Sequence, residues 1–282
     1  MKRVVEAFWD SAALGIRTQV LNLPEDATLG DLSDLTKMDA PYQVVRLPVA
    51  AHGLLHEVQA RDFVFAELQI RMHHDAKIPA LTGPYARAVE SVAIRDATRS
   101  DIELIVERIE SGIFRTDRIA LDPRFGVAVS ARRYSLWLQK AIEDGALCHV
   151  LTRSDVLFGF SLQQRESQSL RGLLGALLDA PSSRGMGWCL PYFEIVAAVR
   201  HGASSGVYVT FSSNNPAVQR AAEKLGFRVV YQEYIFVNNS TLCARVEVNR
   251  DESERILSRP FGRLSGTSGS GLTPEFPLEN RQ

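Results

Sequence analysis

The sequence has few cysteines, no excess of charge of either sign and no long hydrophobic run. Its cysteines, Cys148, Cys189 and Cys243, lack the CxxC spacing of metal and disulfide motifs, so we expect buried, reduced thiols. The 32 lysines and arginines nearly balance the 33 aspartates and glutamates, which argues against a surface for nucleic acid or an anionic membrane. No window approaches the roughly 20 apolar residues of a membrane span, and Glu6 precedes any long apolar run, so we expect neither a membrane anchor nor a signal peptide. These absences predict a cytoplasmic protein.

The composition is that of an ordinary globular protein, with 45% hydrophobic and 23% charged residues among 282. A chain of this length can bury one large core or two modest ones. Proline and glycine cluster at Pro79, Gly83 and Pro84, as is typical of a linker, and glycine, serine and proline are frequent near the end of the chain. The expected divisions are a small αβ domain (1–75), a linker (76–88), a second, larger unit (89–250) and a flexible tail (251–282).

Hydrophobic periodicity predicts an alternation of strands and helices. Thr98 and Asp101 are well placed to cap one of the helices. The expected helices cover residues 29–37, 52–60, 102–113, 130–143, 185–201 and 215–225. The expected strands cover residues 16–23, 42–49, 63–72, 89–94, 147–152, 156–163, 170–178, 206–212 and 228–237.

A short glycine turn, Arg184-Gly185-Met186-Gly187, follows an apolar segment and leads into an apolar helix. A turn of this kind leaves backbone N–H groups unpaired at the positive end of the helix dipole, which favours a phosphate. Glycine at Gly185 and Gly187 allows a close approach of the backbone and torsions that other residues avoid. Such turns are common, so the motif is weak evidence until its surroundings are considered.

The surroundings resemble a known family. The turn, its helix and a strand are followed by Asn215-Pro216-Ala217, and the next helix ends at Leu225-Gly226-Phe227. In this order and spacing, the segment from about residue 89 to 237 resembles the GNAT superfamily of acetyl-CoA-dependent N-acetyltransferases. The resemblance implies an α/β (α+β) fold, with a mixed, largely antiparallel central sheet flanked by helices and preceded by a smaller, degenerate αβ domain.

The resemblance also implies where acetyl-CoA binds. Amides of Arg184, Gly185, Met186 and Gly187 would hold the pyrophosphate, and the Arg184 side chain could add a charged contact. The preceding strand, ending at Leu177, Leu178 and Asp179, would splay from the strand over residues 207–212 and pair with pantetheine, and backbone N–H near Leu178 and Asp179 would polarise the thioester carbonyl. Asn215 would contact the pantetheine arm, or cap its helix before Pro216, or do both.

The sequence departs from the family at two places. Pro191 falls inside the expected helix 185–201, where it would remove a hydrogen bond and could introduce a kink. Ala222 stands where many members carry a tyrosine that acts as general acid toward the departing thiolate. A general acid typically contributes about 10²–10⁴-fold, so its loss would slow the reaction without abolishing it. The alternatives with a hydroxyl are Tyr208, Tyr231 and Tyr234, each of which could equally be a strand-packing aromatic.

The middle of the chain suggests the acceptor. The run from Phe114 to Arg118 and the run from Tyr134 to Leu138, together with the N-terminal block, look like dTDP-fucosamine acetyltransferase and related nucleotide-sugar N-acetyltransferases. The residues that this resemblance places at the acceptor are Asp117, Arg118, Tyr134 and Trp137. Asp117 and Arg118 could instead form a surface salt bridge, and Tyr134 and Trp137 could be helix packing. Arg132 and Arg133 are more simply a solvated helix face.

The general base is left open by the sequence. His149 is in an expected strand, where a lone histidine is usually a core residue, and Glu166 and Asp179 are alternatives near strand ends. His73 and His74 have no carboxylate or cysteine at ligand spacing, so no metal is expected.

The sequence therefore predicts direct acetyl transfer from acetyl-CoA to the primary amine of a small acceptor, most simply a nucleotide-linked amino sugar. Rival hypotheses are another amine acceptor or acyl donor, and a non-catalytic CoA-binding module, which Ala222 would suit. A homodimer is possible. No nucleic acid or membrane partner is expected.

Overall fold

One sheet of ten strands runs through the residues that the computed structural model describes, 3–178 and 185–238. The order across the sheet is β1-β2-β3-β10-β4-β9-β8-β7-β6-β5, so the last strand in sequence lies near the middle. Only the pairs β2–β3 and β8–β9 are parallel. The strands are β1 (Val4–Glu6), β2 (Thr18–Asn22), β3 (Tyr42–Pro48), β4 (Val64–His74), β5 (Ala93–Asp96), β6 (Leu147–Arg153), β7 (Val156–Glu166), β8 (Ser169–Leu177), β9 (Val207–Ser212) and β10 (Arg228–Asn238).

Helices connect most of the strands and cover both faces of the sheet. Thr98 and Asp101 form the predicted capping box at the start of α4. The α-helices of the described residues are α1 (Phe8–Leu14), α2 (Leu55–Gln59), α3 (Gly83–Glu90), α4 (Arg99–Glu110), α5 (Gly126–Glu143), α6 (Cys189–Arg200) and α7 (Pro216–Lys224), and the 3-10 helices are η1 (Leu29–Lys37) and η2 (Val49–Leu54).

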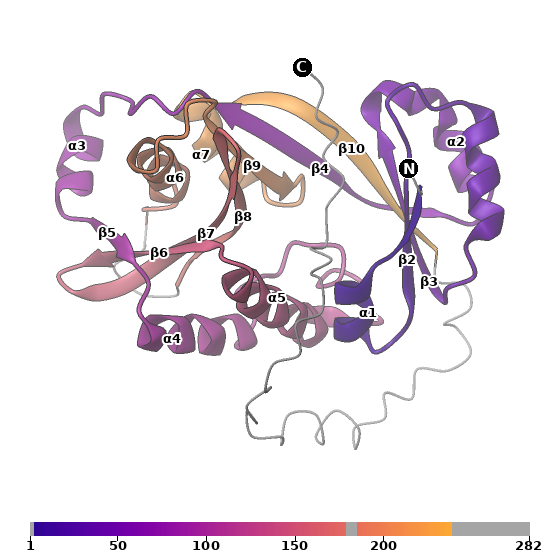
Figure 1. The fold of residues 1–282 in the computed structure, drawn as a ribbon, viewed down its shortest axis with the longest axis horizontal. Helices are drawn as coiled ribbons and strands as arrows, with labels where there is room; N and C mark the ends of the chain where they lie inside the picture. Colours follow the sequence, from indigo (N-terminus) through magenta and orange to yellow (C-terminus); the bar gives the residue numbers. More distant parts are fainter. Residues whose placement is uncertain (1–2, 179–184, 239–282) are drawn as a thin grey trace. The chain divides into compact units, whose positions relative to one another are not determined.

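The two faces of β6–β9 carry different helices. Figure 1 shows α6 on one face and α4 and α5 on the other, with α1 beside α5. Apolar residues of α6 and α7 share one core with β8 and β9, whereas α4 and α5 form a second core against β6, β7 and β8. We call these the α6 face and the α5 face. The expected largely antiparallel sheet flanked by helices is confirmed.

Two parts of the sheet contain strands and helices in the same order. One part runs β2, η1, β3, η2 with α2, and β4; the other runs β8, α6, β9, α7 and β10. In each part, the first two strands are parallel and are joined by a helical crossover: β2 and β3 by η1, and β8 and β9 by α6. The long last strand of each part pairs with the other part, because β10 lies on β3 and β4 lies on β9. The two ladders are both antiparallel and equally long. The β3–β10 ladder runs from Gln43–Asn238 to Pro48–Glu233, and the β9–β4 ladder runs from Val207–His74 to Ser212–Gln69.

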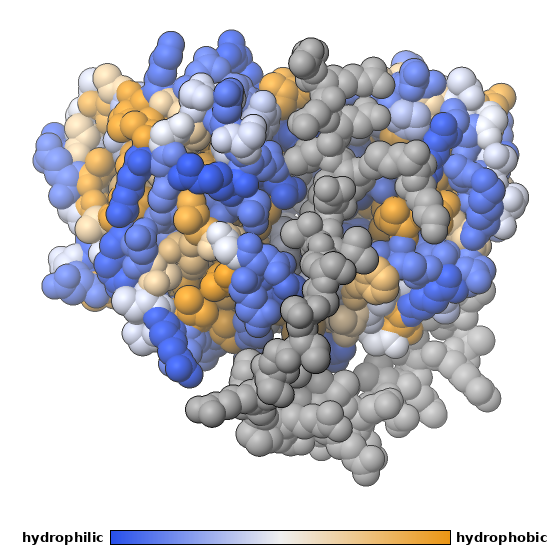
Figure 2. Space-filling model, viewed as in Figure 1, coloured by the Kyte–Doolittle hydropathy of each residue, from blue (hydrophilic) through white to orange (hydrophobic). Residues whose placement is uncertain are grey.

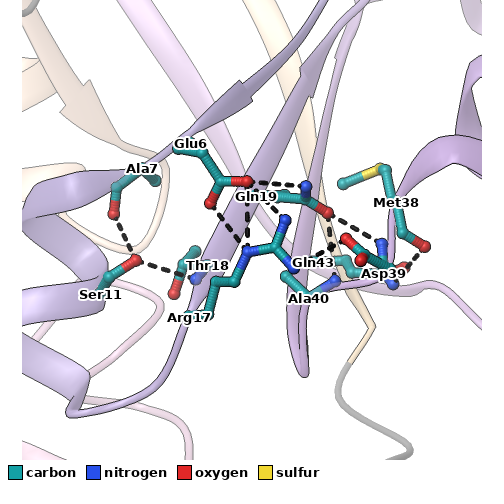
Figure 3. Close-up of polar contacts among 10 residues, drawn as sticks. All are labelled: Glu6, Ala7, Ser11, Arg17, Thr18, Gln19, Met38, Asp39, Ala40 and Gln43. Carbon is teal, nitrogen blue, oxygen red and sulfur yellow. Dashed lines mark hydrogen bonds and ion pairs between the residues drawn. The ribbon is translucent and has the colours of Figure 1, made fainter.

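Polar side chains hold the N-terminal strands together (Figure 3). Glu6 on β1 accepts hydrogen bonds from Arg17 Nη2 at 2.7 Å and from Gln19 Nε2 at 2.9 Å. The side-chain oxygen of Gln19, on β2, accepts from the backbone N–H groups of Asp39 and Ala40 at 2.9 and 3.1 Å. This network fixes β1, β2 and the approach to β3, so the N-terminal crossover is tightly closed.

The surface carries no single dominant apolar area in the view of Figure 2, where hydrophobic residues form separate groups among hydrophilic ones. The most exposed large apolar side chain of the described residues, Phe8, is 75% exposed. No helix in the described residues has the length and apolar character needed to cross a membrane.

Some predicted elements differ from the structure. The segment expected to be a linker contains the start of α3, and the strand expected at 89–94 is displaced to β5, because Pro84 takes an early position of a helix rather than ending one. The helix expected at 29–37 is a 3-10 helix over that range. The division into domains at 75, 88 and 250 stays a prediction, and the expected tail lies outside the described residues.

Candidate functional site

Strands β8 and β9 are parallel neighbours that separate after a short contact. They pair only at Leu170–Val207 and Arg171–Tyr208, although β8 continues to Leu177 and β9 to Ser212. A V-shaped opening therefore lies between them, with its vertex at Arg171 and Tyr208. The splay that the family resemblance implies is present in this chain.

A β-bulge falls next to the vertex. Leu162 pairs with Leu174, but the next residue of β7, Gln163, pairs with Gly172, so Leu173 is an extra residue in β8. Beyond it, Leu178 N–H donates to the Phe158 carbonyl at 2.8 Å. Because backbone groups alternate in direction along a strand, the N–H groups of Gly175 and Leu177 point away from β7 toward the opening.

This geometry corrects the position expected for a carbonyl-polarising donor. Leu178 N–H, expected in that role, is already bonded to β7 in this structure, because it lies on the side of β8 that completes the β7–β8 ladder. The N–H groups of Gly175 and Leu177 are better placed. Asp179 lies outside the described residues.

The glycine turn precedes the N-terminus of α6. Gly185 has φ of +74°, the left-handed conformation expected of it, whereas Gly187 is not among the residues with positive φ. Nothing lies within 4 Å of the position that a Cβ would take at either glycine, so the described residues leave open space there. The helix begins at Cys189 with no side-chain cap and no acidic residue in its first turn. Cys189 N–H donates to the Met186 carbonyl at 2.8 Å and Pro191 has no N–H, so an anion at this N-terminus would meet the Leu190 N–H and a favourable dipole. Arg184 lies outside the described residues.

The expected kink at Pro191 is wrong. Because α6 begins at Cys189 rather than at residue 185, Pro191 is the third helical residue. The N–H that proline lacks is one of the four that a helix start leaves unpaired in any case.

The equivalent place in the N-terminal half is closed. Strands β2 and β3 pair at all five positions from Thr18–Tyr42 to Asn22–Arg46, so they do not splay. The start of η1 is capped by Asp31, whose carboxylate accepts from Thr28 N–H at 2.7 Å. The Asp31 carboxylate, which is paired with Arg3, thus occupies the place that an anion would take there. Of the two crossovers, β8–α6–β9 is the one whose parallel strands separate within the described residues.

A buried carboxylate lies against the vertex on the α6 face. Glu194, from α6, is 8% exposed and its Oε1 lies 3.1 Å from the position that a Cβ would take on Gly172. The Tyr208 carbonyl oxygen lies 3.4 Å from that same position. Ser161 Oγ donates to Glu194 Oε1 at 3.2 Å. Burial raises the pKa of Glu194 to about 7, and the Ser161 hydrogen bond opposes that rise.

Comparison with solved structures identifies the architecture. The chain is similar to a GCN5-related N-acetyltransferase from Sphaerobacter thermophilus, with a TM-score of 0.55 and 14% identity over 83% of this chain and 75% of that one. The chain has the GNAT fold. It is also similar to a functionally unknown conserved protein from Staphylococcus epidermidis ATCC 12228, with a TM-score of 0.50 and 11% identity over 79% of this chain and 84% of that one. No protein-family model and no curated protein matches the sequence.

Within this GNAT fold, the helix after β9 begins at the Asn215-Pro216-Ala217 segment, whose Asn215 was expected to contact the cofactor. The Asn215 side chain accepts from Val218 N–H at 3.4 Å, so it caps α7, and its contact with a cofactor stays a prediction. Ala222 is fully buried in the core that α7 shares with α6. The position that lacks a tyrosine thus faces the α6 side of the sheet.

The α5 face of the GNAT sheet is polar beside the opening. Glu67 on β4 is 2% exposed; its Oε1 accepts from Gln69 Nε2 at 3.2 Å, and its Oε2 is buried with no partner among the described residues. The guanidinium of Arg71 lies 5.2 Å from the centroid of the Tyr231 ring. Since residues two apart on a strand share a face, Glu67, Gln69 and Arg71 form one polar row next to β9.

The residues expected at the acceptor lie on this side, where they contact other side chains of the protein. Asp117 is buried and accepts from Ser130 Oγ at 2.6 Å and from Ile119 N–H at 2.9 Å. Arg118 is buried and donates to Asp10 of α1. Their alternative interpretation as a surface salt bridge is therefore wrong, because both side chains are buried. Their acceptor role stays a prediction.

Asp10 also holds Arg133, which is therefore not on a solvated helix face. Although burial acts in the opposite direction, Arg133 and Arg118 hold the pKa of the Asp10 carboxyl well below its usual range. The Arg133 guanidinium lies over the rings of Tyr134 and Trp137, at 5.5 and 5.9 Å from their centroids. Tyr134 also stacks on Phe114 at 4.4 Å. These aromatics are half-buried helix packing in this structure, and their contact with an acceptor stays a prediction.

Of the tyrosines considered as general acids, only Tyr208 is on a strand of the opening. Its ring lies 4.6 Å from that of His73. Tyr231 donates to Glu233 on β10, and Tyr234 packs against Phe236 in the N-terminal half. All three catalytic roles stay predictions.

Of the expected bases, His149 lies away from the opening, whereas Glu166 pairs with Arg171 at its vertex. His149 is on β6, two strands from β8 or about 10 Å, and contacts His201 at 3.1 Å between their Nε2 atoms. Burial lowers the pKa of His149. Glu166 pairs with Arg171 at 2.7 Å, near the start of β8. The described residues contain no group of histidine, cysteine and carboxylate side chains that could hold a metal.

Sequence reasoning missed Asp10, Glu67 and Glu194. For Glu194 a signal existed, because it is the sole charged residue of α6 before Arg200, in a helix that is otherwise almost wholly apolar. A charged residue in such a helix is seldom buried without a partner or a function.

Proposed function

We propose that the protein transfers an acetyl group from acetyl-CoA to a primary amine. The observation that carries this proposal is the splay of β8 from β9 in a GNAT fold, with the uncapped start of α6 at its open end. An opening between two strands exposes a backbone edge, to which an extended amide-bearing arm can add as a strand would.

Different residues along the opening would bind different parts of acetyl-CoA. Backbone amides at Gly185, Met186 and Gly187 and the start of α6 would bind the pyrophosphate. The edge of β8 at Leu177 and Gly175 would pair with the pantetheine arm. When bound, acetyl-CoA supplies an electrophilic thioester carbonyl, which the N–H groups near the bulge would polarise.

The acceptor would approach from the α5 face. Glu67 supports this placement, since a buried carboxylate oxygen with no partner among the described residues suits an amine or ammonium group. Approach from this side would place the amine next to the edge of β9, opposite the helix that binds the phosphates.

Calorimetry with acetyl-CoA tests the proposal. We expect saturable binding by the wild type, and absence of binding would refute the proposed function. Gly187→Asp should weaken binding at least tenfold, because it adds a negative charge at the helix start. Gly187→Ala is the matched control: a Cβ there meets nothing within 4 Å, so binding should change little.

For the acceptor, we propose a nucleotide-linked amino sugar, by the resemblance of the segment that includes Asp117 and Arg118. A thiol-release assay on dTDP- and UDP-amino sugars, with peptide and antibiotic amines as comparison, distinguishes this acceptor from others. Turnover only with another amine class, or only with another acyl-CoA, would replace the acceptor or donor and leave the reaction type intact. A homodimer and a cytoplasmic location stay predictions.

A second candidate function is binding of CoA without transfer. Ala222 favours it, because no hydroxyl is available where many relatives carry the general acid. Tight acetyl-CoA binding without thiol release on any amine of the panel would support this candidate over the first.

A further inference from the structure

The vertex of the splay brings three elements together around one carboxyl group. Glu194 of α6, Gly172 of β8 and the Tyr208 carbonyl of β9 converge there, with Oε1 of the carboxylate and the carbonyl oxygen within 3.4 Å of the point where a Gly172 Cβ would be. Gly175 makes a second gap, with its Cβ position 3.8 Å from Oε1. A Cβ at Gly172 would be in tight contact with the carboxylate, at 3.1 Å from Oε1. The absence of a side chain at Gly172 and at Gly175 is what leaves room for Glu194.

The polar side chains around Glu194 come from β7. Ser161 lies opposite Gly175 in the ladder and donates to the carboxylate. Gln163, two residues further on and so on the same face, lies opposite Gly172. Gln163 is 0% exposed, and both atoms of its amide lack a partner among the described residues. Buried amides are rarely left without hydrogen bonds, so the Gln163 amide at the vertex can donate to and accept from a ligand.

If the proposed function holds, the vertex lies at the sulfur end of the bound cofactor. Coenzyme A carries its pyrophosphate and its sulfur at opposite ends of the pantetheine arm. With the pyrophosphate at the start of α6, the arm runs back along β8 toward the vertex. From Cys189 to Glu194 the helix rises about 7.5 Å in the same direction, so Glu194 accompanies the arm toward the bulge.

We propose that Glu194 is the general acid that protonates the departing sulfur of coenzyme A, in place of the hydroxyl that the chain lacks at Ala222. Both residues belong to helices on the α6 face, and α6 contacts α7, so the proton would come from the side of the sheet that a tyrosine at residue 222 would have occupied. Burial keeps the Glu194 carboxyl protonated up to about neutral pH, with the pKa at about 7. Among the described residues, no cation forms an ion pair with Glu194 that would remove that proton.

The proton balance of the step closes without another reactant. The amine nitrogen bonds to the carbonyl carbon, the carbon–sulfur bond breaks, and its electron pair stays on sulfur. Glu194 gives its proton to that sulfur, which produces the thiol of coenzyme A. The proton that the nitrogen loses restores the carboxyl group through water.

Infrared spectroscopy tests the assignment without requiring an acceptor. The wild type should show the band of a protonated carboxyl at pH 6, and the band should disappear with a midpoint of about 7. Glu194→Gln should remove this band. Glu67→Gln, which removes a buried carboxyl on the opposite face, is the matched control and should leave it. If the band survives in Glu194→Gln, the proposal is overturned.

Addition of acetyl-CoA gives the deciding result. Contact with the sulfur end should shift the Glu194 band, whereas a CoA analogue in which sulfur is replaced by a methylene group should shift it less. With hydroxylamine as the nucleophile, Glu194→Gln should release thiol on the order of 10²-fold more slowly than the wild type, while its acetyl-CoA Kd stays within about threefold.

The outcomes separate this proposal from the proposed function. If acetyl-CoA binds but neither the band nor the rate responds, Glu194 is not the acid, and the site of acetyl transfer stands. If acetyl-CoA does not bind to the wild type, the proposed function fails as well. Ser161→Ala provides a second variant, since loss of its hydrogen bond should move the titration of Glu194 to higher pH.

Discussion

At the scale of single residues, two buried carboxylates of this protein are held in opposite charge states. Glu194 has a hydroxyl neighbour and no ion pair among the described residues, so burial dominates and favours its neutral form. Asp10 has Arg118 and Arg133, so attraction outweighs burial and the carboxyl stays ionised. The first state suits proton donation, and the second suits a fixed scaffold between α1 and α5.

The raised pKa of Glu194 predicts a pH-dependent stability. Because the folded state holds this proton more tightly than the unfolded state, stability is fully present below pH 4.5 and decreases as pH rises to about 7. The decrease from this residue is about 3 kcal/mol. Urea unfolding at pH 5 and pH 8 should show a larger loss for the wild type than for Glu194→Gln. Equal losses in the two proteins would contradict this prediction.

Asp10→Asn should destabilise the protein by about 3 kcal/mol or more, because it leaves two buried guanidinium groups without their counter-charge. The depressed pKa of Asp10 gives the opposite sign of pH dependence: its stabilisation is present above the unfolded pKa near 4 and is lost as pH falls further. Chemical unfolding at pH 7 measures the change. Glu103→Gln, which removes an exposed partner of Arg99, should cost under about 1 kcal/mol and serves as the control. Similar costs for both variants would show that the Asp10 pairs carry little energy.

At the scale of elements, the two crossovers differ in one respect that decides function. Strands β8 and β9 part after two pairs, whereas β2 and β3 stay paired along five. The separated pair β8 and β9 has an extra residue at Leu173 and is connected through the long helix α6. The fully paired β2 and β3 are connected through the shorter 3-10 helix η1. Of the two crossovers, the β8–β9 crossover is the one whose strands part and so expose a backbone edge between them.

This difference predicts a stoichiometry of one acetyl-CoA per chain. The N-terminal crossover has no splayed edge, and Asp31 occupies the start of η1. Calorimetry should therefore give a single site, and Gly187→Asp should weaken it without revealing another. Two sites per chain would show that the N-terminal half also binds the cofactor.

Much of this element-level organisation could be predicted from sequence because its signals are local. The glycine turn, the apolar helix and the Asn215 cap each occupy a few neighbouring residues, so the order β8, α6, β9, α7, β10 followed from short patterns. The start of α6 was misplaced because residues 185–188 continue the apolar pattern of the helix. Glu194 was missed because its burial depends on the glycines of β8, which periodicity within the helix does not show.

At the scale of the whole molecule, the exchange of β4 and β10 could not be predicted. Gln43 and Asn238 pair across most of the described chain, and no local pattern specifies a register over such a distance. An N-terminal domain and a GNAT domain were expected as successive units, yet each half of the sheet is completed by a strand of the other half.

The exchange predicts that the halves do not fold separately. Residues 76–238 expressed alone should be largely unfolded or aggregated, because β9 and β10 would both lose β4 as a neighbour. Co-expression with residues 1–75 should restore soluble protein. Circular dichroism and gel filtration of the fragments measure this. A folded, monomeric fragment 76–238 would contradict the prediction.

The central place of β10 also has a consequence for synthesis on the ribosome. The chain emerges from its N-terminus, so β3 and β4 are complete long before residues 228–238 are translated. Until then, both strands present unpaired edges to other nascent chains. The protein should therefore depend on chaperones more than its size suggests, and its final folding should begin only when β10 leaves the exit tunnel.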